Sequence, residues 1–171
     1  MDFPIFNNHA TLRFERQELI DDIKNYAYIE GDTMKRDAEH DKHMVFDIAE
    51  KGNIDRVTRV LDLTFAQCVE LCYPYAKKEV KANTSRDNEL EEEDEYVMLL
   101  NLPATFSETT VTLLEKYIHE YMVYRVMEDW MGLTKPESML FWREKADKLE
   151  VEIKKALNSR SKAFTRKLHP F

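Results

Sequence analysis

The sequence has only three glycines, two cysteines and no long apolar run. Three scattered glycines cannot form a glycine-rich phosphate loop, which excludes the usual nucleotide-binding patterns. Two cysteines exclude a disulfide framework, and Cys68 and Cys72, one helical turn apart, are predicted to pack as small reduced side chains. The longest apolar runs, such as VMLLNLP, fall far short of the ~20 residues needed to cross a bilayer.

The first residues, MDFPIFNNHATLRF, lack the basic flank and the apolar stretch of a signal peptide. We therefore expect a chain with no membrane span that stays in the cytoplasm of the cell that makes it. At 171 residues, 43% hydrophobic and 34% charged, the composition predicts one folded domain with a heavily charged surface.

Charge is distributed unevenly along the chain, whose net charge is -8. Residues 154–171 hold six of the 25 basic side chains and no acidic one, so residues 1–153 carry 19 basic and 33 acidic side chains. A body this acidic is repelled by DNA, and we expect no direct sequence-specific contact with nucleic acid. The pattern predicts a single domain over 1–157 and a basic C-terminal arm over 158–171.

Gly31, Gly52 and Gly132 each follow a stretch with helical periodicity. We interpret them as residues just past helix ends, where a left-handed conformation closes the helix. This interpretation predicts helices over about 16–30 and about 34–51.

Three more helices are predicted further along the chain. One follows Asn53 as its cap and ends or bends at Pro74. A long helix, apolar over most of its circumference, follows a capping box at Thr105–Glu108 and runs to about 131, which suits the centre of a bundle. The last follows a second capping box at Thr134–Glu137 and has a near-heptad apolar stripe: Met139, Trp142, Ala146, Leu149, Ile153 and Ala156.

The stretch between the third and fourth helices favours β structure around an acidic centre. Residues 79–84 and 96–100 can pair as an antiparallel hairpin within about 76–102, and Thr11–Glu15 can add a short strand. The acidic run at the hairpin tip is either a solvated loop or an electrostatic docking finger. The predicted fold is therefore mainly α: a bundle of about five helices with one β-hairpin insertion and an extended C-terminal arm.

A possible metal site is the cluster of His40, His43 and Asp47 on neighbouring turns of one predicted helix. Metal sites in helical bundles draw ligands from several helices, and the only other histidine on a predicted helix is His119. No matching Glu-x-x-His pair completes a di-iron site, so solvated side chains are favoured and we expect no metal or cofactor. A metal-dependent helical-bundle enzyme built on these residues is the alternative function.

Catalysis by a cysteine nucleophile is also disfavoured. Cys68 and Cys72 lie on the apolar stripe of their helix, and no histidine stands at helical spacing from them. The aromatic stretch from Tyr117 to Trp130 serves equally well in a core or at an interface between copies. The sequence thus favours a non-enzymatic protein.

Four stretches carry a resemblance to a known class of proteins: LIDDIKNYAYIEGD, GNIDRVTRVLDLTFAQCVELCYPYAKKE, LEKYIHEYMVYRVMEDWMGLT and FWREKADKLEVEIKKAL. Together with the basic tail, they resemble proteins from the structural-gene region of tailed phages and prophages of Bacteroides-type bacteria. A helical bundle of this size with a hairpin and an arm is similar to head-tail connector (adaptor) proteins. Short acidic tail-completion or neck proteins of the same gene region are close competitors.

The resemblance implies a ring of copies beneath the portal, located in the neck of the virion and, during assembly, in the host cytoplasm. It also implies a role for the arm, which would reach onto a portal, a tail or neck protein, or a neighbouring copy. In that role cationic side chains pair with carboxylates and apolar side chains serve as anchors. The residues concerned are Arg160, Lys162, Phe164, Arg166, Lys167, Leu168 and Phe171.

Overall fold

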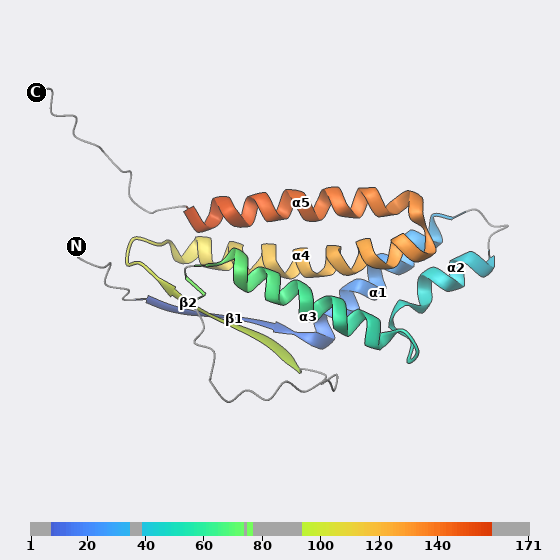
Figure 1. Cartoon of the computed structure of the whole chain (residues 1–171), viewed down its shortest axis with the longest axis horizontal. Helices are drawn as coiled ribbons and strands as arrows, with labels where there is room; N and C mark the ends of the chain where they lie inside the picture. Colours follow the sequence, from blue (N-terminus) through green and yellow to red (C-terminus); the bar gives the residue numbers. More distant parts are fainter. Residues whose placement is uncertain (1–7, 35–38, 74, 77–93, 159–171) are drawn as a thin grey trace, which may run out of the picture.

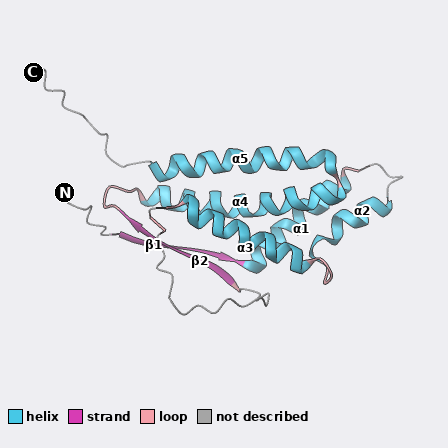
Figure 2. Ribbon diagram, viewed as in Figure 1, coloured by secondary structure: helices cyan, strands magenta, loops and turns pink. Residues whose placement is uncertain are grey.

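The computed structural model describes residues 8–34, 39–73, 75–76 and 94–158 (Figure 1). Over these residues the chain forms five α-helices, one 3₁₀ turn and two strands (Figure 2). The mainly helical fold with an antiparallel pair of strands is confirmed. In chain order the elements are β1 (Asn8–Glu15), α1 (Arg16–Asp32), α2 (Glu39–Phe46), η1 (Asp47–Ala49), α3 (Ile54–Leu71), β2 (Glu95–Leu102), α4 (Glu108–Thr134) and α5 (Pro136–Asn158).

The central element is α4, which packs against α1, α2, α3, α5 and β1. Its buried residues occupy most of its circumference, as the sequence predicted: Leu114, Ile118, Tyr121, Met122, Val123, Val126, Met127, Trp130 and Met131. A helix that is apolar on nearly every side is stable only when other elements cover it. In Figure 1, α4 accordingly lies between α5 on one side and α3 and α1 on the other.

The two strands form a small antiparallel sheet from segments far apart in the sequence. β1 pairs with β2 in a register that places Thr11 opposite Leu99. In β1 the side chains of Ala10, Leu12 and Phe14 face the helices, as do the even-numbered ones of β2, which are all buried. We expected β2 to pair with residues 79–84, which lie outside the described residues. In the structure β2 pairs instead with β1, the N-terminal strand that the sequence only suggested as an addition.

The sheet is fixed to α3 by both apolar and polar contacts. The Phe65 ring of α3 lies 6.3 Å from the Phe14 ring and 5.2 Å from the Tyr96 ring, measured between centroids. The Tyr96 hydroxyl also donates to Asp62 of α3 at 2.7 Å. Alternation with a period of two brings these inward residues to one face, which is why the sheet covers the core on one side only.

Neither predicted capping box forms. The N-cap of α4 is Ser107 rather than Thr105, and it makes no side-chain cap bond. Thr134 is the last residue of α4, and its hydroxyl donates to the Trp130 carbonyl at 3.0 Å. Because only Lys135 separates α4 from α5, no extended residue is left to act as the N-cap of the second box.

The interpretation of the glycines as helix-ending residues is wrong for Gly31 and Gly132, which lie inside α1 and α4. None of the three glycines has a positive φ. Gly31 is instead a contact position, because a Cβ there would lie 2.3 Å from Cε1 of Phe46. The Phe46 ring also stacks on Tyr28, one turn earlier in α1, at 5.4 Å. Gly31 thus lets the end of α2 pack closely on α1.

The expected second helix, 34–51, is shorter in the structure. α2 ends at Phe46 and is followed by the 3₁₀ turn η1. The chain then turns into α3, whose N-cap is Asn53 as predicted. The Asn53 side chain does not cap α3 but donates to the Asp47 carbonyl at 2.8 Å, and so holds the turn. Within the described part of the chain, no helix combines the length and apolar character that crossing a bilayer requires.

The apolar stripe of α5 packs on α4 as predicted, with Trp142 at its centre and only 2% exposed. Its Nε1 donates to Glu30 of α1 at 2.9 Å. Glu30 also accepts from Lys135 at 2.7 Å and from Ser138 at 3.1 Å. One carboxylate therefore fastens the start of α5 to the end of α1.

We predict that Gly31→Ala destabilises the protein by about 1–3 kcal/mol, because the new methyl group overlaps the Phe46 ring. In a Phe46→Ala background the same change should stabilise by roughly 0.5–1 kcal/mol, because alanine is then simply the better helix former. Urea unfolding of the four proteins measures both effects. Gly52→Ala is the control, since nothing lies within 4 Å of its added Cβ. A destabilisation that persists without the Phe46 ring contradicts this explanation.

We predict that Trp142→Ala lowers the free energy of unfolding by about 3–5 kcal/mol, the range for deletion of a buried aromatic side chain. Trp142→Phe keeps an aromatic ring but loses part of its volume and the bond to Glu30, so it should cost less, about 1–2 kcal/mol. Chemical denaturation is the measurement. Equal losses for both variants would show that the hydrogen bond, and not the packing, holds α5.

Candidate interaction groove

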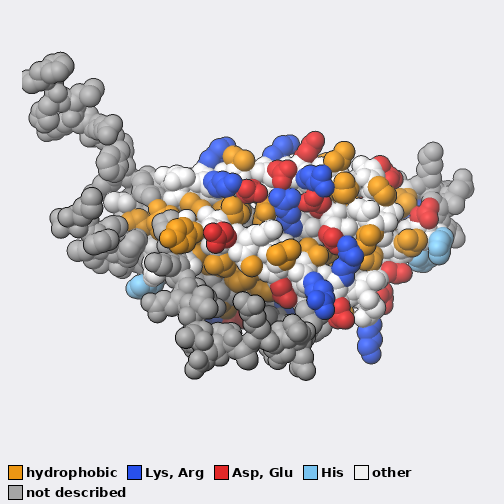
Figure 3. All heavy atoms as spheres, in the orientation of Figure 1, with side chains coloured by type: hydrophobic (Ala, Val, Ile, Leu, Met, Phe, Trp, Pro, Cys, Tyr) orange, Lys and Arg blue, Asp and Glu red, His pale blue; other side chains and the backbone are white. Residues whose placement is uncertain are grey.

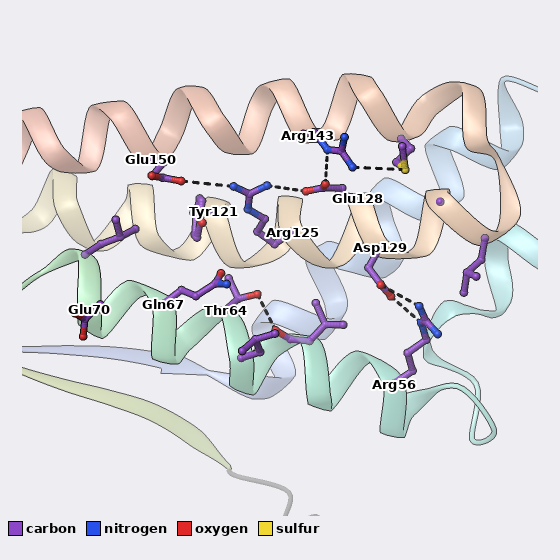
Figure 4. A pocket seen from close by; sticks show the side chains of 16 residues that line it. Arg56, Thr64, Gln67, Glu70, Tyr121, Arg125, Glu128, Asp129, Arg143 and Glu150 are labelled. Atoms are coloured by element: carbon purple, nitrogen blue, oxygen red, sulfur yellow. Dashed lines mark hydrogen bonds and ion pairs between the residues drawn. The ribbon is translucent and has the colours of Figure 1, made fainter. Parts of the chain in front are cut away.

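In the second half of α4, from Tyr121 to Thr134, the charged residues lie in one narrow stripe. Tyr121, Arg125, Glu128 and Asp129 follow one another at helical spacing, and they face the space between α3 and α5 (Figure 4). This space is a groove of about 780 Å³. It exists because α3 and α5 both pack on α4 from different sides and leave this stripe between them.

The groove combines apolar and ionic side chains. Leu63 on α3 and Leu133 at the end of α4 line it and are 63% and 55% exposed. Leu71 and Met139 add apolar surface on its walls. On the face in Figure 3, hydrophobic side chains lie among basic and acidic ones along the same helices. Interfaces between proteins commonly mix exposed apolar side chains with arginine in this way.

Arg125 is the centre of the ionic network. Its guanidinium donates to Glu128 at 2.7 Å and to Asp147 of α5 at 2.9 Å, and it lies 3.6 Å from Glu150. The same group lies 5.0 Å from the centroid of the Tyr121 ring. The side chains of Arg125 and Glu128 are 20% and 16% exposed, so this pair is partly shielded from solvent screening.

Two further arginines close the network on either side. Arg143 of α5 donates to Glu128 at 2.7 Å. Arg56 of α3 makes two bonds to Asp129, at 2.7 and 2.9 Å. Paired bonds of this kind fix orientation as well as distance. The arginines therefore tie α3 and α5 to the polar stripe of α4 and set the width of the groove.

Interactions in the groove shift the pKa values of Arg125, Arg56 and Tyr121 upward. Burial by itself would lower the pKa of Arg125, but its interactions with Tyr121 and Glu128 outweigh burial and raise it. The hydrogen bond to Asp129 raises the pKa of Arg56. Burial likewise raises the pKa of Tyr121. A general acid or base works best with a pKa near the operating pH, so these shifts move the groups away from catalysis.

Both cysteines are buried in the core, as predicted: Cys68 lies on α3 and Cys72 is the residue that ends this helix. Burial raises the pKa of the Cys68 thiol well above its ordinary value and that of Cys72 to about 12. A nucleophilic cysteine needs the opposite, a lowered pKa and an exposed sulfur.

The residues of the predicted metal cluster lie on α2 and η1, where His40, His43 and Asp47 are exposed. His119 is far from them: its Nε2 contacts Asp22 of α1 at 2.8 Å. The helix α4 is linked to α2 by Trp130, whose Nε1 donates to the Val45 carbonyl. Trp130 lies eleven residues after His119, which corresponds to about 16 Å along the helix. Among the described residues, no group of three or more His, Cys, Asp or Glu side chains could hold a metal ion.

The predicted arm residues, 160–171, lie outside the described part of the chain, as does most of the acidic run. Of that run the structure describes Asp94 and Glu95. Glu95 belongs to β2 and pairs with Arg13 of β1 at 2.6 Å.

The groove was not predicted from the sequence, although a signal for it exists. Arg125, Glu128 and Asp129 are the only charged residues from Tyr121 to Thr134, and the two acids stand three and four residues after the arginine. Charges at such spacing mark the one face of a central helix that is not fully covered.

No protein family, curated protein or solved structure matches this chain.

We predict that Arg125→Met destabilises the protein by about 1–3 kcal/mol, because it removes a cationic partner from Glu128 and from Glu150, whose side chains are only 16% and 30% exposed. Arg143→Met is the matched control. Its side chain is 47% exposed and Glu128 keeps Arg125, so the loss should stay below about 1 kcal/mol. Thermal or urea unfolding at moderate salt compares the two, and equal losses would contradict a central role for Arg125.

Proposed function

We propose that this protein is a non-enzymatic assembly protein that acts by binding other proteins through its groove and its basic arm. The observation that carries the proposal is the groove itself. It offers exposed leucines beside a network of ion pairs. The pKa values of Tyr121 and Arg125 in this groove are raised, which moves both groups away from the range of acid-base catalysis. Such a surface suits recognition by shape, apolar contact and charge.

The more specific proposal rests on the resemblance described above. We propose that the chain is a subunit of the head-tail connector of a tailed phage, where copies form a ring, dock on the portal and contact tail or neck proteins. The rigid ionic network is consistent with this role, because a connector subunit needs a fixed surface rather than a flexible active-site loop. The arm residues Arg160, Lys162, Phe164, Arg166, Lys167, Leu168 and Phe171 would supply the contacts to the portal or to a neighbouring copy.

Deleting residues 159–171 tests this proposal, because α5 ends at Asn158. The melting temperature should change by no more than a few degrees, since the described core is left complete. In cells that produce particles without the native copy of the gene, the shortened protein should fail to enter the particles, whereas the full chain should restore head-tail joining. Sedimentation of particles followed by mass spectrometry is the measurement. Normal incorporation of the shortened chain would overturn the docking role of the arm.

A further inference from the structure

We propose that the groove between α3, α4 and α5 binds the C-terminal arm, residues 159–171, of a second copy of this chain. The inference rests on the proposed function, since it names the partner that the groove takes during assembly. It is argued from charge, from length and from the place where α5 ends.

The groove and its rim carry an excess of negative charge. Its lining has three guanidinium groups, those of Arg56, Arg125 and Arg143, and four carboxylates: Glu70, Glu128, Asp129 and Glu150. At the rim, Asp147 pairs with Arg125 and Lys154 pairs with Glu150 at 2.6 Å. The two carboxylates that are least neutralised lie on α3 and α5. Glu70 is exposed and has no ion-pair partner within the described residues, and Asp147 is 58% exposed with Arg125 as its partner. The arm has four basic and no acidic side chains, so its charge is opposite to that of the groove.

Apolar contacts are available on both partners. The groove exposes Leu63 and Leu133, and its walls include Leu71 and Met139. The arm interleaves three large apolar side chains with its cations: Phe164, Leu168 and Phe171. Charges increase the rate of encounter, while burial of apolar area of this kind supplies most of the binding energy.

The dimensions also agree. Along α4 the groove runs from Tyr121 to Leu133, twelve residues and thus about 18 Å. An extended segment rises about 3.3 Å per residue, so six of the thirteen arm residues can follow the whole groove. The remaining residues can bridge the gap between two copies.

The position of the acidic end favours contact between copies. Glu70 and Glu150 mark one end of the groove, toward the end of α5 from which the arm departs (Figures 1 and 4). An arm that entered the groove of its own chain would have to reverse its direction over the last two turns of α5. An arm that continues away from its own α5 meets a neighbour without this turn.

An arm and a groove are different surfaces, so a contact between them is heterologous. Each copy then offers one free arm and one free groove, and the contact repeats from copy to copy. Repetition closes into a ring if the rotation per step allows it and otherwise produces an open filament. One pair of complementary surfaces is therefore sufficient to build the proposed ring.

Two full-length variants test the inference. The groove variant combines Glu70→Lys with Leu63→Ser, both at exposed positions on α3. The arm variant reverses the charge of Arg160, Lys162, Arg166 and Lys167. The matched control combines Glu144→Lys with Leu140→Ser, an acidic and an apolar residue that are exposed on α5 and do not line the groove.

Sedimentation velocity over a range of concentrations is the measurement, and circular dichroism verifies that each variant is folded. Wild type and control should self-associate, with an affinity that falls as salt is raised. Each variant alone should associate at least tenfold more weakly. An equimolar mixture of the two should form a dimer and stop there, because it contains one intact arm and one intact groove per pair.

Three results would overturn the inference. If the wild type is monomeric while the mixture forms dimers, the arm occupies the groove of its own chain. If the wild type associates and the mixture does not, the groove is not the receptor. If neither associates, there is no contact between arm and groove. Incorporation into particles separates these results from the proposed function. If the arm variant fails to enter particles while the groove variant enters normally, the arm still docks on the particle. Only the assignment of the groove as its receptor is then wrong.

Discussion

The fold depends on the need to cover α4. From Leu114 to Met131 its buried residues occupy most of its circumference, and in water such a helix is stable only when other elements cover it. The hydrophobic effect is non-directional. It therefore requires that other elements cover α4, but it does not determine which elements do so. The shell of covering elements consists of α5, α3, α1, α2 and one strand, drawn from both halves of the chain.

Specific polar contacts then decide how the shell is arranged. Glu30 collects Lys135, Ser138 and Trp142 and so fixes α5 to α1. Trp130 donates to the Val45 carbonyl at 3.0 Å and fixes α2 to α4. An alternative packing would leave these partly buried groups without partners, at a cost of about 1–3 kcal/mol each. The polar contacts thus select one packing among many of similar apolar area.

The groove follows from the same constraint. Its polar stripe is the part of α4 that the shell leaves uncovered, and the arginines that bridge it hold α3 and α5 at a fixed separation. A groove built by ion pairs between three helices is rigid, and a rigid surface loses little conformational entropy when a partner binds. This connects the energetics of the bundle with the proposal that the protein works as an assembly component.

The sequence by itself determined the helical class, the central place of α4 and the stripe of α5 around Trp142, because these depend on the local periodicity of apolar residues. It also indicated the buried state of Cys68. The tertiary structure alone decided that β1 is the partner of β2, since pairing between segments 80 residues apart leaves no local pattern. It also decided that Gly31 is a contact for Phe46 rather than a helix end, because the reason for that glycine lies on another helix. For the same reason the groove could not be located beforehand: Arg125 and Glu128 are visible as isolated charges on α4, but Arg56, Arg143 and Asp147 reach them only after three helices have packed together.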